Sequence, residues 1–189
     1  GKDASGISLY IEGSGATTDL SGVTSAEGDI IIDDAVRVVG ESKLYSTDGN
    51  ITITGGTGGI YSASGSNNDL YLVAENGTLI AGNQTGFGDN SGSDSFINNL
   101  ELRSGNATIG DGDQAISGIF DTSANTLTIL GASSTNLSAD SYSMHEVQGN
   151  NNSLTLTATT TGYGGYVESI SDVLDLTFNG NGSDASFDL

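Results

Sequence analysis

The residues best suited to chemistry in this chain are carboxylates and side-chain amides in short glycine-rich turns. Three such turns read GDNSGSD (88–94), GDGD (110–113) and GNGSD (180–184). Calcium prefers hard oxygen ligands of this kind. The candidate calcium ligands are therefore Asp89, Asn90, Asp94, Asp111, Asp113, Asn181 and Asp184. No turn matches an EF-hand loop or a tandem calcium-binding nonapeptide, and Asx turns that bond their own backbone are the alternative.

Hydrolysis by paired carboxylates is the second chemistry to consider, because two acids can flank a glycosidic bond. The candidate pairs are Asp33/Asp34, Asp111/Asp113 and Asp172/Asp175. A sugar cleft also needs aromatic side chains, and the chain has no Trp, seven Tyr and five Phe. His145 is the only histidine, cysteine is absent, and no nucleophile elbow is present. We therefore expect no enzymatic activity and no required cofactor.

The polar turns separate units that resemble one another. The clearest unit is DLYLVAENGTLIAG (69–82), in which two apolar alternations flank Asn76-Gly77. Similar units begin at the leading aliphatic residues Leu44, Leu70, Leu100, Leu127, Leu154 and Leu174. Most of these leucines are separated by about 27 residues, and such a period is typical of stacked structural repeats.

Composition restricts the possible partners and the fold. The chain has 24 acidic and 4 basic residues and a net charge of −20. Nucleic acid and anionic membranes are therefore poor partners, and no apolar run is long enough to insert into a membrane. Proline is absent while glycine occurs 29 times. This combination suits a chain that is almost all β, with every strand in a hydrogen-bond ladder and glycine at tight corners.

Two all-β folds fit the repeats. In a parallel β-helix of about six to seven coils, each unit forms one coil that stacks on the next. In an antiparallel β-sandwich, each unit is a hairpin, and Asn76-Gly77 is a good hairpin turn. We favour the parallel β-helix, because the other units lack a consistent two-residue turn and solenoid corners tolerate variable turns.

The phrases GDIIIDDAV (28–36), DGNITITG (48–55), DLYLVAENGTLIAG (69–82) and NLELRSGNATIGD (99–111) resemble the repeats of filamentous-haemagglutinin-like exoproteins. These are large adhesins secreted by Gram-negative bacteria. The resemblance covers residues 28–178 and implies a right-handed parallel β-helix in a secreted, extracellular or cell-surface bacterial protein. The Arg-Gly-Asp triplet and the secretion domain of that family are not found in the sequence, and the chain is much shorter than such proteins.

We expect two regions: an N-terminal cap, linker or donor strand (1–26) and a solenoid repeat domain (27–189). The chain begins without Met, so we expect a processed protein or a fragment. Its expected role is a structural building block of an extracellular fibre, filament or adhesin that self-associates through strand edges, with Ile7, Leu9 and Ile11 as the donor segment. The alternative is a β-helix that binds or cleaves carbohydrate, including host or surface glycans, through a groove lined by Tyr10, Tyr61, Tyr71 and other tyrosines, with carboxylates flanking it.

The calcium hypothesis makes a direct prediction. A ligand that binds only the folded chain raises its melting temperature. Thermal melts followed by circular dichroism should therefore show a higher melting temperature with calcium than with a chelator. Equal melting temperatures would leave the turn residues with a structural role only.

Overall fold

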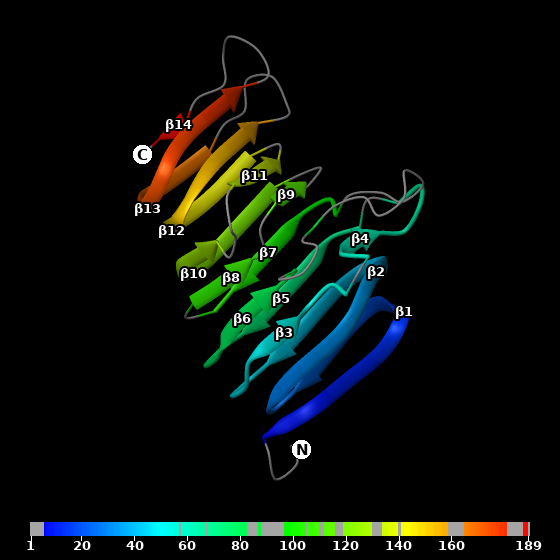
Figure 1. The fold of residues 1–189 in the computed structure, drawn as a ribbon. Helices are drawn as coiled ribbons and strands as arrows, with labels where there is room; N and C mark the ends of the chain where they lie inside the picture. Colours follow the sequence, from blue (N-terminus) through cyan, green and yellow to red (C-terminus); the bar gives the residue numbers. More distant parts are fainter. Residues whose placement is uncertain are drawn as a thin grey trace.

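The computed structural model (Figure 1) describes residues 6–56, 58–66, 68–82, 87, 97–104, 106–109, 112–115, 119–129, 134–139, 141–158, 165–180 and 187–188. Regular structure in these residues is entirely β, without helices. The strands are β1 (Ile7–Ala26), β2 (Asp29–Ser46), β3 (Ile51–Ile53), β4 (Ile60–Ser62), β5 (Leu70–Ala74), β6 (Thr78–Ala81), β7 (Leu100–Arg103), β8 (Asn106–Ile109), β9 (Gly112–Ala115), β10 (Ile119–Ile129), β11 (Ser134–Ala139), β12 (Ser141–Ala158), β13 (Gly165–Gly180) and β14 (Phe187–Asp188).

The protein is a parallel β-solenoid of about six turns, which confirms the favoured fold. All of the strand pairs found among the described residues are parallel, so the antiparallel sandwich is wrong. The stack runs from β1 at one end to β13 and β14 at the other (Figure 1).

The long strand β2 bends through one turn and pairs with three different strands of the following turn. Its start pairs with β3, its middle with β4 and its end with β5. We call these three columns of parallel strands the first, second and third ladder. The segment DLYLVAENGTLIAG is a third-ladder strand (β5), a corner and a first-ladder strand (β6), not a hairpin.

Inward side chains of successive turns stack into continuous apolar columns. One column in the first ladder contains Ile30, Ile51, Leu79, Ala107, Leu127 and Val147, each at most 1% exposed. Burial of one such large aliphatic side chain contributes about 1.5–3 kcal/mol relative to exposure. Successive turns thus share one core, and each turn depends on its neighbours for burial.

The leading leucines of the sequence repeat do not form a single column. Leu70 and Leu100 are in register in the third ladder, whereas Leu127 belongs to the first ladder and Leu154 to the second. Leu174 is 70% exposed. The register shifts between β12 and β13 on either side of Asn152 and Val173, directly before Leu174, which accounts for its departure from the inward pattern.

Glycines allow successive corners between the third and first ladders to touch. A Cβ on Gly49 would lie 2.2 Å from the carbonyl carbon of Gly28, and a Cβ on Gly77 would lie 2.1 Å from the carbonyl oxygen of Gly49. Real side chains do not fit such spaces. The Asn-Gly at 76–77 is therefore a close-packed corner in which the glycine is required for space.

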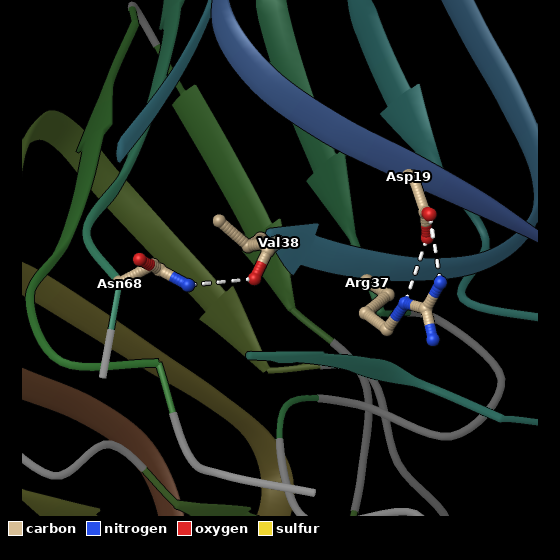
Figure 2. A network of polar contacts seen from close by, with 4 residues as sticks. All are labelled: Asp19, Arg37, Val38 and Asn68. Carbon is tan, nitrogen blue, oxygen red and sulfur yellow. Dashed lines mark hydrogen bonds and ion pairs between the residues drawn. The ribbon is translucent and has the colours of Figure 1, made fainter. Parts of the chain in front are cut away.

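Polar side chains join these corners along the stack. The Asn50 amide N–H donates to Asp29 Oδ1 at 2.7 Å, and the Thr78 amide N–H donates to Asn50 Oδ1 at 2.9 Å. In the loop after β4, the Asn68 Nδ2 group donates to the Val38 carbonyl at 2.9 Å (Figure 2). Each of these bonds connects one turn to the preceding turn, so corner backbone groups are satisfied between turns.

The described part of the N-terminal region is the strand β1, which pairs with β2 in all three ladders, with register shifts at its bends. Arg37 of β2 lies opposite Asp19 of β1, and the two side chains form an ion pair at 2.7 Å (Figure 2). The Arg37 guanidinium holds the pKa of the Asp19 carboxyl below its usual range. Because both side chains are about half exposed, this pair stabilises the fold by less than about 1 kcal/mol.

The corner contacts predict that Gly77→Ala is strongly destabilising. The new Cβ would meet backbone atoms of Gly49, so we expect a loss of about 3 kcal/mol in the free energy of unfolding. The control is Gly65→Ala, where φ is +72° and no atom lies within 4 Å, and backbone strain alone should cost about 1 kcal/mol. Urea unfolding of both variants measures the difference, and equal losses would contradict the close packing.

Candidate functional site

Six of the seven predicted calcium ligands lie outside the described residues: Asp89, Asn90, Asp94, Asp111, Asn181 and Asp184. Asp113 is in strand β9, whose backbone pairs with β11. Within the described ranges, no three acidic or histidine side chains come together in a group able to hold a metal ion.

The described carboxylates of the candidate pairs accept hydrogen bonds from hydroxyl groups of neighbouring turns. Asp33 and Asp34 are consecutive at the bend of β2 between the first and second ladders, and both line one small hollow. Asp33 accepts a hydrogen bond from the Thr54 hydroxyl at 2.8 Å, whereas Asp34 is 5% exposed and accepts one from the Thr18 hydroxyl at 3.3 Å. In the third pair, Asp175 accepts a hydrogen bond from the Ser153 hydroxyl at 3.4 Å. These carboxylates join neighbouring turns.

The only histidine lies on the surface. His145 Nδ1 is 2.9 Å from Glu168 Oε2, and both side chains are more than half exposed. The pair joins β12 to β13 across the third ladder. Within the described residues, the hydrogen-bond partner of His145 is Glu168 and not a serine hydroxyl or a cysteine thiol.

The proposed donor segment is part of the end turn of the stack. Ile7, Leu9 and Ile11 lie opposite Asp29, Ile30 and Ile32 of β2, and Leu9 and Ile11 pack against the core. Among the described strands, β2 is the only partner of β1. At the other end, β14 pairs with β13 only at Gly165 and Tyr166.

The three tyrosines predicted to line a sugar groove are not brought together. Tyr10 lies opposite Ile31 in the first ladder, Tyr61 opposite Arg37 in the second, and Tyr71 opposite Lys43 in the third. Tyr61 is also 5% exposed. A groove lined by these three residues is therefore not formed.

A different tyrosine, Tyr45, borders a hollow that the sequence did not reveal. The hollow measures about 490 Å³ and lies between β1 and β2, where the third ladder turns into the first. Its lining residues are Ser8, Leu9, Thr24, Ser25, Ala26, Glu27, Tyr45 and Thr47. In the sequence, KLYS (43–46) indicates only that Lys43 and Tyr45 lie on the outer face of a strand. It does not indicate which hydroxyl groups lie near the Tyr45 ring.

A second hollow of about 250 Å³ lies beside the buried carboxylate of Asp34. Its other lining residues are Gly13, Gly15, Ala16, Asp33, Ala35 and Gly56. Apart from the two aspartates it presents backbone and methyl groups. It therefore offers fewer directional contacts to a ligand than the hollow beside Tyr45.

Comparisons with known proteins identify no relative: no family model, no curated protein and no solved structure matches this chain. In the part of the chain that the structure describes, no helix is long and apolar enough to cross a membrane. The fold and the surface chemistry are therefore the basis for proposing a function.

One buried titratable group affects stability rather than chemistry. The Tyr142 hydroxyl lies inside the core, 2.5 Å from the Leu137 carbonyl oxygen and 2.7 Å from the Thr157 carbonyl oxygen, and these two acceptors share its single proton. Burial raises the pKa of Tyr142 well above that of a free tyrosine. The neutral phenol is thus the form that the fold requires.

This raised pKa predicts a specific pH dependence. The stability from neutral Tyr142 is complete below the unfolded pKa of about 10 and is lost as pH rises above it, because the unfolded chain ionises first. Tyr142→Phe should cost about 1 kcal/mol at neutral pH through the lost hydrogen bond and should reduce the alkaline loss. Tyr166→Phe, at a half-exposed position, is the control for chemical denaturation at pH 7 to 11. An unchanged alkaline loss in Tyr142→Phe would contradict this assignment.

Proposed function

We propose that this protein is a structural building block of an extracellular fibre, filament or surface adhesin, and that it self-associates through strand edges. The observation that supports this proposal is the continuous parallel ladder from β1 to β13. A stack of this kind provides length and rigidity, and its strand edges are templates for further strands. Extension of the stack is therefore the activity best suited to this architecture.

The end turns have the features that edge pairing requires. Among the described strands, β1 has one partner, and most of β13 pairs only with β12. Both end strands carry exposed aliphatic side chains, with Val23 at 73%, Leu174 at 70% and Leu176 at 39% exposure. Strand addition by a second copy would pair backbone groups and cover apolar surface together.

The extracellular location in this proposal rests on the haemagglutinin-like phrases. These phrases fall on the corners and strands that build the turns: 28–36 covers a corner and the start of β2, and 69–82 covers β5, a corner and β6. Repeats of this type in secreted adhesins of Gram-negative bacteria serve as stalks. The net charge of −20 and the absence of cysteine are consistent with a soluble secreted stalk.

Edge pairing predicts that a charge at the end turn blocks assembly while the same charge in an interior turn does not. Val23→Glu places a carboxylate on exposed β1, where it would repel a second acidic copy. Val39→Glu adds the same charge on β2, where the side chain is 42% exposed. Negative-stain microscopy and light scattering should show filaments for the native chain and Val39→Glu, and few or none for Val23→Glu.

Deletion of residues 1–12 is the second test, because it removes the donor segment. Filaments that persist after this deletion, or in Val23→Glu, would exclude β1 as the joining edge. A native chain that stays monomeric at high protein concentration and high ionic strength, where charge repulsion is screened, would exclude self-association itself.

A further inference from the structure

The hollow beside Tyr45 has walls that are fixed by backbone contacts between the first two turns. The Thr47 amide N–H donates to the Ala26 carbonyl at 3.1 Å, and the Asp48 amide N–H donates to the Glu27 carbonyl at 2.9 Å. The Gly28 amide N–H donates to the Ser8 hydroxyl at 2.7 Å. A hydroxyl that accepts one bond can still donate another, so Ser8 retains a donor for a ligand.

The ring of Tyr45 is held in place from two sides. The Lys43 ammonium nitrogen lies over this ring, 5.5 Å from the centroid, and the Tyr45 hydroxyl donates to the Glu75 carboxylate on the next turn. This hydrogen bond and burial raise the pKa of Tyr45, so the phenol stays neutral. The hollow thus combines an oriented aromatic ring with several hydroxyl groups.

The lining limits the class of ligand. Its polar groups are the hydroxyls of Ser8, Thr24, Ser25 and Thr47 together with the Glu27 carboxylate, and none of the lining residues is basic. The Lys43 ammonium over the Tyr45 ring is a cation beside the hollow. With a net charge of −20 on the chain, this surface disfavours anionic ligands such as uronic acids, phosphates and nucleic acids. The apolar part of the lining, which includes Leu9, Ala26 and the Tyr45 ring, is mixed with these polar groups, so the hollow does not suit a purely apolar ligand.

We propose that this hollow binds a neutral carbohydrate. The apolar face of one sugar ring packs against Tyr45, and the sugar hydroxyls bond to Glu27 and to the Ser and Thr hydroxyls around it. The volume lies within the range of small-molecule sites. A carboxylate accepts hydrogen bonds from sugar hydroxyls without requiring charge on the ligand.

The hollow lies on the end turn that the proposed function assigns to edge pairing, because Ser8, Leu9, Thr24, Ser25 and Ala26 belong to β1. Sugar binding is therefore measured on the native chain at a protein concentration at which light scattering shows monomers. Sugar binding without filaments would contradict the proposed function alone, and filaments without sugar binding would contradict this proposal alone.

The test uses saturation-transfer NMR and calorimetry with four neutral tetrasaccharides: malto-, cello-, xylo- and mannotetraose. A tetramer of galacturonic acid is the anionic comparison. We expect at least one neutral tetrasaccharide to bind and the anionic one to bind more weakly. Tyr45→Ala should weaken binding by about tenfold or more, because the ring contact is lost. Glu27→Gln, at an exposed position, should weaken it without changing the melting temperature.

Tyr10→Ala is the matched control, since Tyr10 is 52% exposed and lies outside the hollow. Its affinity should equal that of the native chain. The proposal is overturned if no neutral tetrasaccharide binds at up to about 10 mM, the weak end of measurable sugar affinities. It is also overturned if Glu27→Gln and Tyr45→Ala both bind as the native chain does, or if the anionic tetramer binds best.

Discussion

The parallel hydrogen-bond ladder between successive turns is the constraint on which the rest of the structure depends. A parallel ladder keeps neighbouring strands in register, so an inward side chain on one turn must lie over an inward side chain on the next. This explains the column from Ile30 to Val147 in the first ladder. Because each turn contacts only its neighbours, stability is approximately a sum of local terms along the stack.

The corners determine how closely the turns can approach. At Gly28, Gly49 and Gly77 the backbones of successive corners are in contact, and no side chain could be placed between them. Between these contacts, Asn50 and Thr78 supply hydrogen bonds from turn to turn. At these described corners, close packing explains the glycines and bonding between turns explains the polar residues. Asp29 and Asn50, which are of the residue types that suggest calcium binding in the sequence, form ties between corners.

The sequence predicted the architecture because the solenoid has a period that appears directly in the residues. Alternating Leu, Ile and Val predict strands, and their recurrence predicts stacked turns. The exact register was not predictable, because turns differ in length: Ile51 to Leu79 spans 28 residues and Leu127 to Val147 spans 20. Leu44, Leu127 and Leu154 therefore occupy different ladders despite similar local phrases. Asn76-Gly77 supported the alternative hairpin fold in the sequence, because the same dipeptide suits both a hairpin turn and a close-packed corner.

The candidate site was less predictable than the fold. Tyr10, Tyr61 and Tyr71 lie in separate ladders, and the ladder to which a residue belongs depends on turn lengths that the sequence pattern does not define. Tyr45, Ser8 and Glu27 line one hollow because β1 pairs with β2 both at its start and at its end. Proximity of this kind comes from the tertiary structure, so residue type and local spacing could not reveal it.

The end strands β1 and β14 lie at opposite ends of the stack, and the ladder bonds run between turns along the same direction (Figure 1). A mechanical load applied through these end turns would therefore strain the bonds at one end turn before those of the interior. The turns would detach one after another, each releasing contour length at a modest force, so a tether built from this fold would yield gradually and absorb a sudden pull.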